Sequence, residues 1–230
     1  MKLKILLQAR TNSSRLPAKS LLPIAGVPLA VLAFKRATNL NATGLVVTSN
    51  EPEDDELCSL FEKNNINFYR GSQNNVLERF YEATKHDDPE TPFVRLTADN
   101  VFPDEDLINQ VAKHFYTSNI EYLICNGYQS NLPNGVSLEV SKIKFLREAY
   151  QNSSNSKQLE HVTTYIKERY GSHQFIHTPQ SSYLSNKSCT IDTFEDYLKI
   201  ASIFRNIEDP INISYLALVK LLDKAPDFGS

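Results

Sequence analysis

Short apolar runs of β type alternate with helical patterns over the first 116 residues, and this alternation constrains the fold more than any other feature. It predicts strands over 5–7, 44–48, 67–69 and 93–96, and helices over 28–39, 54–64, 74–85 and 104–116. Elements in this order form a mainly parallel central sheet with right-handed crossovers and helices on both faces. The sequence therefore predicts the α/β fold class.

The alternation stops after residue 116. The segments 121–125 and 135–141 and a polar stretch around 151–157 do not continue it, while later patterns predict a strand over 188–191 and helices over 159–169, 193–204 and 214–223. We interpret residues 126–183 as a small insertion lobe above the sheet, where a second substrate or a partner subunit would lie. A chain of 230 residues is long enough for one α/β domain with such an excursion, so we take 1–230 as a single domain.

Charge and composition argue against several classes of function. The net charge is −3 at pH 7, which does not favour a broad nucleic-acid-binding surface. No apolar run approaches the roughly 20 residues that span a bilayer, so no membrane partner is expected. Cys58, Cys125 and Cys189 are far apart and lack the spacing of metal ligands. Their odd number and the lack of a secretory pattern predict free thiols in a cytoplasmic protein.

A cationic loop follows the first predicted strand. Residues 8–21 read QARTNSSRLPAKSL, and Arg10, Arg15 and Lys19 are four or five residues apart. Ligands of open α/β sheets bind beyond the carboxyl ends of the strands, and these side chains suit a strongly anionic ligand such as a polyphosphate. Gln8 and the backbone N–H groups of the loop could contact a nucleobase edge. The alternative is a solvated basic loop with no ligand.

Two aspartates follow predicted strands. Asp99 comes just after the strand over 93–96, and Asp192 follows the predicted strand over 188–191. Two carboxylates at one edge of a sheet can converge on Mg²⁺, which takes one or two carboxylates together with phosphates and water. The alternatives are a helix cap or turn former for Asp99 and a helix N-cap for Asp192.

Three further segments carry weaker signals. Glu160 and His161 open a predicted helix, where a lone histidine is more often structural than catalytic. The segment 134–139, which ends at Glu139, could line an acceptor pocket or form a turn and an ordinary strand. The segment 70–72 could contact a base or ribose, or form a turn.

These segments together resemble a family of sugar-activating cytidylyltransferases. The pattern QARxxSxRLPxKxL at 8–21, with GxPL at 26–29, resembles the opening of the spore-coat polysaccharide biosynthesis cytidylyltransferase-like proteins, relatives of the acylneuraminate and Kdo cytidylyltransferases. The likeness continues in the same order through RGS at 70–72, VLERFY at 76–81, RLTAD at 95–99, EHVT at 160–163 and IDTFED at 191–196.

The resemblance implies a GT-A-like, Rossmann-like nucleotidyltransferase fold. It also implies a Mg²⁺-dependent reaction in which CTP and an acidic sugar, such as a nonulosonic acid or a Kdo-like 2-keto-3-deoxy sugar acid, give a CMP-sugar and pyrophosphate for polysaccharide biosynthesis. Members of the family are commonly dimers whose insertion lobes embrace. We expect a homodimer here, with residues 126–183 as the dimerisation lobe.

The resemblance also implies a role for each matched residue. The predicted catalytic residues are Arg15, Lys19 and Asp99, and the predicted metal ligands are Asp99 and Asp192. The predicted nucleotide-binding residues are Gln8, Ala9, Arg10, Ser13, Arg15, Lys19, Arg70, Gly71, Thr97 and Ala98. The predicted sugar-binding residues are Glu139, Glu160 and His161.

Several positions depart from the family pattern. Asn12 and Ala18 stand where the family usually has glycine, and a left-handed Ala18 would cost roughly 1 kcal/mol. Asn75 and Ser137 stand where relatives often have aspartate, and residues 100–101, Asn-Val, replace a usual Cys-Pro.

Two other functions are also consistent with the sequence. One is a glycosyltransferase that consumes a nucleotide sugar, although the triplet 99–101 lacks the Asp-x-Asp spacing that this chemistry usually needs. The other is a non-catalytic nucleotide-binding relative.

Overall fold

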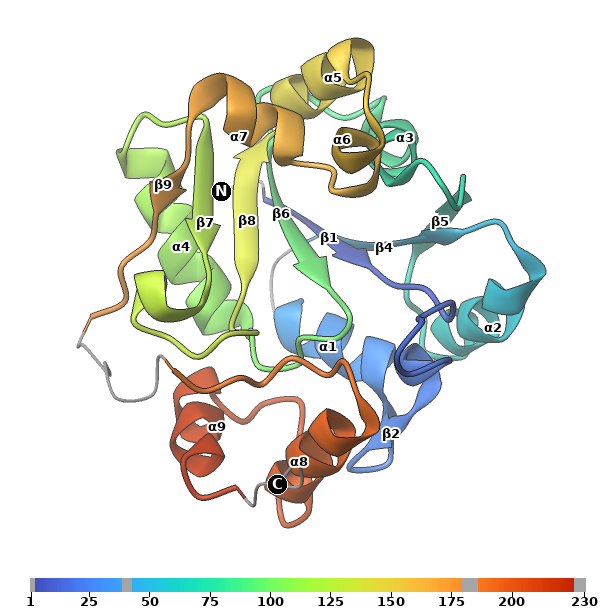
Figure 1. The fold of residues 1–230 in the computed structure, drawn as a ribbon, viewed down its shortest axis with the longest axis vertical. Coiled ribbons are helices and arrows are strands. Elements are labelled where there is room, and N and C mark those ends of the chain that lie inside the picture. The colour runs from blue at the N-terminus through green and yellow to red at the C-terminus, as the bar shows by residue number, and fades with distance from the viewer. Residues whose placement is uncertain (1–2, 39–42, 179–185, 226–230) are drawn as a thin grey trace.

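A seven-stranded sheet in the order β5-β4-β1-β6-β8-β7-β9 forms the centre of the computed structural model, which describes residues 3–38, 43–178 and 186–225 (Figure 1). The strands are β1 Lys4–Gln8, β4 Thr43–Ser49, β5 Phe68–Gly71, β6 Pro92–Thr97, β7 Tyr122–Cys125, β8 Leu138–Lys142 and β9 His173–Gln174. A separate hairpin joins β2 Pro23–Ile24 to β3 Val27–Pro28. The neighbours β5, β4, β1 and β6 are all parallel, as the sequence predicts.

Helices cover both faces of this sheet. They are α1 Leu29–Ala37, α2 Asp55–Lys63, α3 Val76–Thr84, α4 Glu105–Thr117, α5 Ile143–Asn152, α6 Ser156–Glu160, α7 Thr164–Tyr170, α8 Phe194–Phe204 and α9 Tyr215–Leu222. Residue 39, the predicted end of the first helix, lies outside the described residues. Short 3-10 helices occupy Lys19–Leu21, Pro52–Asp54 and Gly127–Ser130. The predicted fold class is confirmed.

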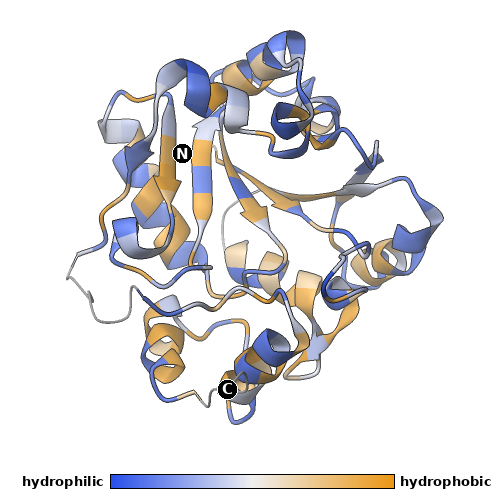
Figure 2. Ribbon diagram, in the orientation of Figure 1, coloured by the Kyte–Doolittle hydropathy of each residue, from blue (hydrophilic) through white to orange (hydrophobic). Residues whose placement is uncertain are grey.

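Alternation along β1 divides the core into two layers. Ile5 and Leu7 join one buried cluster, which includes α1, α2, α4, α8 and α9. Leu6 joins the second cluster, which includes α3, α5 and α7. Figure 2 shows the central strands as largely hydrophobic, with polar residues concentrated on the outer surfaces of the helices. Because both faces are covered, the ends of the strands are where polar residues can gather.

The stretch 126–183 differs from the expected lobe. Its strand β8 enters the central sheet between β6 and β7 and pairs with both in antiparallel fashion, and β9 extends the sheet beyond β7. An antiparallel strand needs no crossover helix, so the β-α alternation that marks the first half is absent. Helix α5 of this stretch packs beside α3, and α7 packs on α5 and β7 (Figure 1). Residues 179–183 lie outside the described ranges.

Two further predictions are wrong in detail. The predicted helix over 159–169 is two helices, α6 and α7, because Val162 is buried with a left-handed φ of 36° between them. The predicted strand over 188–191 forms only an isolated bridge from Ser188 to Asn134.

Cys58, Cys125 and Cys189 are free and buried, as predicted, and burial raises the pKa of Cys125 to about 12. Within the described ranges, no helix combines the length and apolar character required to cross a membrane.

Arg36 ties the C-terminal region to the sheet. This side chain of α1 is fully buried, and its guanidinium donates to five backbone carbonyl oxygens, those of Val101, Phe102, Pro210, Ile211 and Ile213. Burial lowers its pKa to about 10, an effect that Asp104 and Asp209 partly offset, so the group is charged at neutral pH. A single side chain thus fixes the loop that precedes α9.

The substitution Arg36→Met should lower the free energy of unfolding by about 3 kcal/mol, because it leaves buried carbonyl oxygens without donors. Urea unfolding measures this, with Lys35→Met as the matched control on the same helix. A loss no larger than that of the control would contradict the assigned role.

Candidate active site

A polar cleft of about 360 Å³ opens at the carboxyl ends of β1 and β6. Twelve predicted site residues line it, namely Gln8, Ala9, Arg10, Ser13, Arg15, Lys19, Thr97, Ala98, Asp99, Glu160, His161 and Asp192. They come from four separate parts of the chain, and the fold brings all of them to one edge of the sheet.

The ammonium group of Lys19 lies at the centre of this cleft. Its Nζ donates to Asp99 Oδ2 at 2.9 Å and to Asp192 Oδ1 at 3.1 Å, and also to the carbonyl oxygen of Ile191 at 2.7 Å. The Lys19 side chain is 12% exposed, and Arg15 adds a second contact to Asp192 Oδ1 at 3.0 Å. One cation therefore holds both carboxylates at a common centre.

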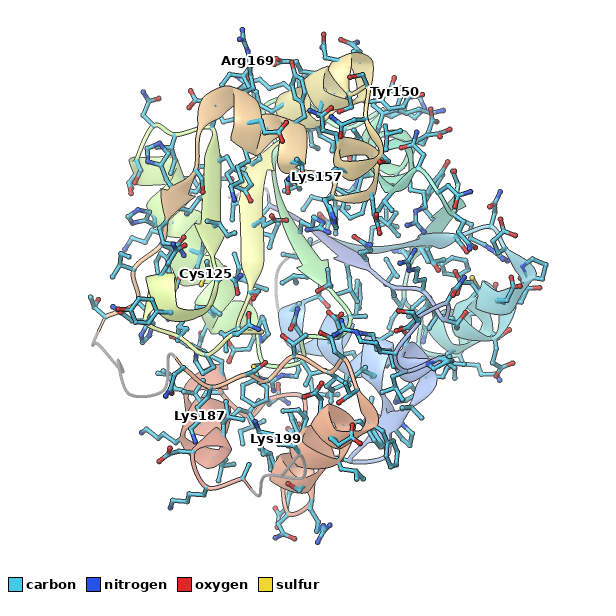
Figure 3. The ribbon with its side chains drawn as sticks, viewed as in Figure 1. Cys125, Tyr150, Lys157, Arg169, Lys187 and Lys199 are labelled. Atoms are coloured by element: carbon cyan, nitrogen blue, oxygen red, sulfur yellow. The ribbon has the colours of Figure 1, made fainter. Side chains whose placement is uncertain are left out.

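Asp192 reaches this centre without the predicted strand. The Ile191 N–H donates to the Asp99 carbonyl oxygen at 3.0 Å, and the Cys189 N–H donates to that of Asn134 at 2.8 Å. Lys199 of α8 lies beside this segment (Figure 3), and its Nζ donates to the Ser188 carbonyl oxygen at 3.2 Å. The segment 188–192 thus passes over the sheet edge as an extended connection.

Gly135 makes room for this connection. Its φ is +95°, and a Cβ built there would lie 2.6 Å from the Thr190 nitrogen and 2.9 Å from Asn100 Oδ1. Thr190 Oγ1 also donates to Asn100 Oδ1 at 3.0 Å. Asn100, one of the departures from the family pattern, therefore links the end of β6 to the segment that carries Asp192.

Neither aspartate serves as a helix cap. Thr193 is the N-cap of α8 and forms a capping box with Asp196, while the N-cap of α4 is Asp104. Asp99 Oδ1 accepts from Thr97 Oγ1 at 2.7 Å, which orients the carboxylate at the end of β6. Both capping alternatives are therefore wrong, whereas Asp99 does lie in a turn just after β6. Both carboxylates line the cleft.

The cationic loop is closed by its own backbone. The Ala18 N–H donates to the Thr11 carbonyl oxygen at 2.9 Å, and Ser20 Oγ donates to that of Arg10 at 2.7 Å. Ala18 adopts the left-handed conformation, with φ 57°, where the family usually has glycine, whereas Asn12 does not. The loop therefore contains backbone strain just before Lys19.

Asp54 anchors this loop and was not predicted from the sequence. It is 1% exposed, and its Oδ1 accepts from Thr11 N and Thr11 Oγ1, each at 2.7 Å. Its Oδ2 accepts from Thr48 Oγ1 and from Ser49. Burial raises the pKa of Asp54, but these hydrogen bonds outweigh it and hold the pKa below its usual value. A local pattern cannot reveal a contact across 43 residues.

The carboxylates of the cleft can bind Mg²⁺ only if a bound ligand supplies further oxygen atoms. Across residues 3–38, 43–178 and 186–225, no group of three or more His, Cys, Asp or Glu side chains is placed to hold a metal. Asp99 and Asp192 supply two carboxylates that already share one cationic partner. Two carboxylates with phosphate oxygens and water are a usual Mg²⁺ environment, so the residues present fit this metal in the company of a polyphosphate.

Arg70 and Gly71 lie outside this cleft. They line a separate hollow of about 470 Å³, and Arg70 donates to the carbonyl oxygens of Ser49 and Glu51 and pairs with Asp55 at 2.7 Å. Arg79 lines the same hollow, and none of its buried guanidinium nitrogens has a hydrogen-bond partner among the described residues. The structure thus separates these two predicted nucleotide-binding residues from the other eight.

Glu139 lines a neighbouring pocket of about 150 Å³, which shares Thr97 with the main cleft. Its Oε2 accepts from Arg95 at 2.5 Å, and its Oε1 accepts from Tyr122 at 2.6 Å and Thr163 at 2.9 Å. Burial raises the pKa of Glu139, but Arg95 and these hydrogen bonds hold it below its usual value. Both carboxylate oxygens are therefore already engaged.

The substitutions at Asn75 and Ser137 have local structural explanations. Asn75 is the N-cap of α3, and its Oδ1 accepts from the Glu78 N–H at 2.9 Å. Asparagine and aspartate are nearly equivalent at an N-cap, so this change keeps the helix start. Ser137 Oγ donates to Asn126 Oδ1 at 2.5 Å at the rim of the smaller pocket.

Comparisons with known proteins find a matching family model and several similar chains. The family model described as Cytidylyltransferase matches residues 4–224. The chain is 28% identical to the spore coat polysaccharide biosynthesis protein SpsF of Bacillus subtilis, over 96% of this chain and 94% of that protein. It is 25% identical to the 3-deoxy-manno-octulosonate cytidylyltransferase of Lawsonia intracellularis, over 76% and 75%. A cytidylyltransferase structure from Leptospira borgpetersenii superposes with a TM-score of 0.83 at 26% identity, covering 97% of this chain and 94% of that one.

The substitution Asp54→Asn should change how the free energy of unfolding depends on pH. A carboxylate with a lowered folded pKa stabilises the fold above its unfolded pKa of about 3.9, and this contribution is lost as the pH falls through the folded pKa. The wild type should therefore lose more stability than Asp54→Asn as the pH falls below about 4. Urea unfolding at several pH values measures this, with the exposed Asp106→Asn as control. Parallel profiles for wild type and Asp54→Asn would refute the assignment.

The substitution Ala18→Gly should raise the free energy of unfolding by about 0.5–1 kcal/mol, because glycine adopts the left-handed conformation without strain. The matched control is Ala83→Gly inside α3, which should instead lose about 1 kcal/mol. Thermal or urea unfolding measures both changes. A lower free energy of unfolding for both variants would show that Ala18 is not strained.

Proposed function

Since the chain belongs to the cytidylyltransferase family, we propose that it transfers CMP from CTP to an acidic sugar, releases pyrophosphate and serves the biosynthesis of a polysaccharide. The observation that carries this proposal is the convergence of Asp99 and Asp192 on Lys19, in a cleft rimmed by two arginines. A site with this balance of charges suits a triphosphate accompanied by a divalent cation.

In the proposed reaction the protein mainly positions and neutralises the reactants. Arg10, Arg15 and Lys19 surround the triphosphate and offset its charge as it moves toward pyrophosphate. A sugar hydroxyl attacks the α-phosphorus in line: the new P–O bond forms, the bond to the β-phosphate oxygen breaks, and the hydroxyl proton leaves to solvent or a nearby base. Holding the two reactants in this geometry supplies much of the rate enhancement.

Asp99 and Asp192 would hold Mg²⁺ beside the triphosphate. When bound, the metal supplies further neutralisation of the phosphate charge. Lys19 then releases the two carboxylates and contacts phosphate oxygens instead. The two aspartates thus have a cationic partner both with and without substrate, which limits their repulsion.

We place the acidic sugar beside Thr97, between the main cleft and the smaller pocket that Glu139 lines. Glu160 and His161 also line the main cleft, and the His161 ring can donate a hydrogen bond to the sugar carboxylate. The Lawsonia relative supports a sugar acid by its name, and SpsF supports a polysaccharide pathway.

The nucleoside would extend from the phosphates toward the hollow at Arg70 and Gly71. Gln8, Ala9, Ser13 and Ala98 line the main cleft and are available to contact the nucleotide there. We further propose that the enzyme works in the cytoplasm as a homodimer, with the stretch 126–183 as the contact between subunits.

Pyrophosphate release from CTP tests the reaction directly. The assay uses Mg²⁺ and a panel of nonulosonic acids and Kdo, with a matched set of neutral sugars as controls. Release with at least one sugar acid, and not with its neutral counterpart, is expected. No release with any acid on the panel would count against the proposed acceptor.

The substitutions Lys19→Ala and Asp192→Ala should each reduce the rate at least ~100-fold, because each removes a charge from the centre of the site. The exposed residues Lys113 and Asp106 provide the controls Lys113→Ala and Asp106→Ala, which should leave the rate unchanged. Near-normal rates for Lys19→Ala or Asp192→Ala would refute the assigned roles.

A further inference from the structure

A chain of side-chain hydrogen bonds connects the main cleft to the interior of the sheet. Gln8 Oε1 accepts from Arg95 Nη2 at 2.9 Å, and Arg95 Nη1 donates to Glu139 at 2.5 Å. Glu139 in turn accepts from Tyr122 and Thr163. The chain crosses β1, β6, β8 and β7 and ends just before α7. Each link is therefore held by a different element of the fold.

The register of the sheet keeps these links in place. Arg95 lies opposite Leu6 on β1 and opposite Glu139 on β8, so the three residues form one row across the strands. The side chains of Arg95 and Glu139 are only 14% and 17% exposed. A largely buried ion pair adds little stability compared with apolar residues of the same size. The pair is therefore better explained by what it orients than by stability.

The Arg95–Glu139 pair orients the carboxamide of Gln8. A guanidinium only donates hydrogen bonds, so the Gln8 oxygen must face Arg95, and the N–H groups are left to donate elsewhere. Gln8 lines the cleft that contains Lys19 and Asp99, whereas it does not line the pocket of Glu139. The matching ligand group is a hydrogen-bond acceptor of the nucleotide.

We propose that Arg95 and Glu139 are positioning residues, which fix Gln8 so that its carboxamide donates to an acceptor atom of the bound nucleotide. This assignment replaces the direct sugar contact expected of Glu139 from the sequence, because both of its carboxylate oxygens are engaged. It rests on the proposed function for the identity of the nucleotide.

Calorimetric titration with CTP and Mg²⁺, in the absence of any sugar, tests the proposal. Gln8→Leu and Arg95→Met should each weaken CTP binding about tenfold, the effect of one lost hydrogen bond of this kind. In the Gln8→Leu background, Arg95→Met should cause no further loss, because its effect acts through Gln8. The exposed Gln151→Leu is the control and should bind CTP as the wild type does.

A second, more conservative set of variants keeps the test valid if Arg95→Met does not fold. Glu139→Gln keeps the shape of the side chain and should weaken CTP binding a few-fold on its own. In the Gln8→Leu background the same substitution should cause no further loss of affinity. Thermal unfolding checks that each variant is folded. Wild-type affinity in Gln8→Leu, or a loss from Arg95→Met or Glu139→Gln that persists in that background, would overturn the positioning role. If the wild type binds CTP and releases pyrophosphate while Gln8→Leu is unaffected, only this inference fails. If the wild type binds no CTP, the proposed function fails, and this inference with it.

Discussion

The contact of one ammonium group with two carboxylates is the interaction on which the rest of this site depends. Without Lys19 between them, Asp99 and Asp192 would face each other across a partly buried cleft and repel. With it, the loop after β1, the end of β6 and the segment before α8 are held at one point. The same arrangement gives a triphosphate a cation to contact and a metal two ligands to use.

The surroundings of the site supply the rigidity that this arrangement needs. Asp54 fixes the start of the cationic loop, and Asn100 with Gly135 fixes the path of the segment that carries Asp192. None of these three contacts a ligand in the proposed reaction. They determine where charged atoms sit, and a site that acts by positioning depends on such supports.

The sequence predicts the first half of the fold well because each parallel strand is followed by a helix that covers it. Twelve residues of the cleft are also predicted from the sequence. Those after β1 and β6 meet because the carboxyl ends of parallel strands lie at one edge of a sheet, whereas Glu160 and His161 are indicated only by the family resemblance. Prediction from the sequence fails for β8, whose antiparallel pairing gives no β-α alternation, and for the extended segment 188–192, which short-range β propensity predicts as a strand. Asp54 and the engagement of Glu139 depend on contacts tens of residues away, which periodicity cannot reveal.

The central claim is that Lys19, Asp99 and Asp192 surround the phosphates of a bound nucleotide. A crystal structure of the protein with CTP and Mg²⁺ tests it most directly. The triphosphate should lie in the 360 Å³ cleft, with Lys19 on phosphate oxygens and the metal bound by both aspartates. A triphosphate bound elsewhere, with Lys19 still bridging the two carboxylates, would contradict it.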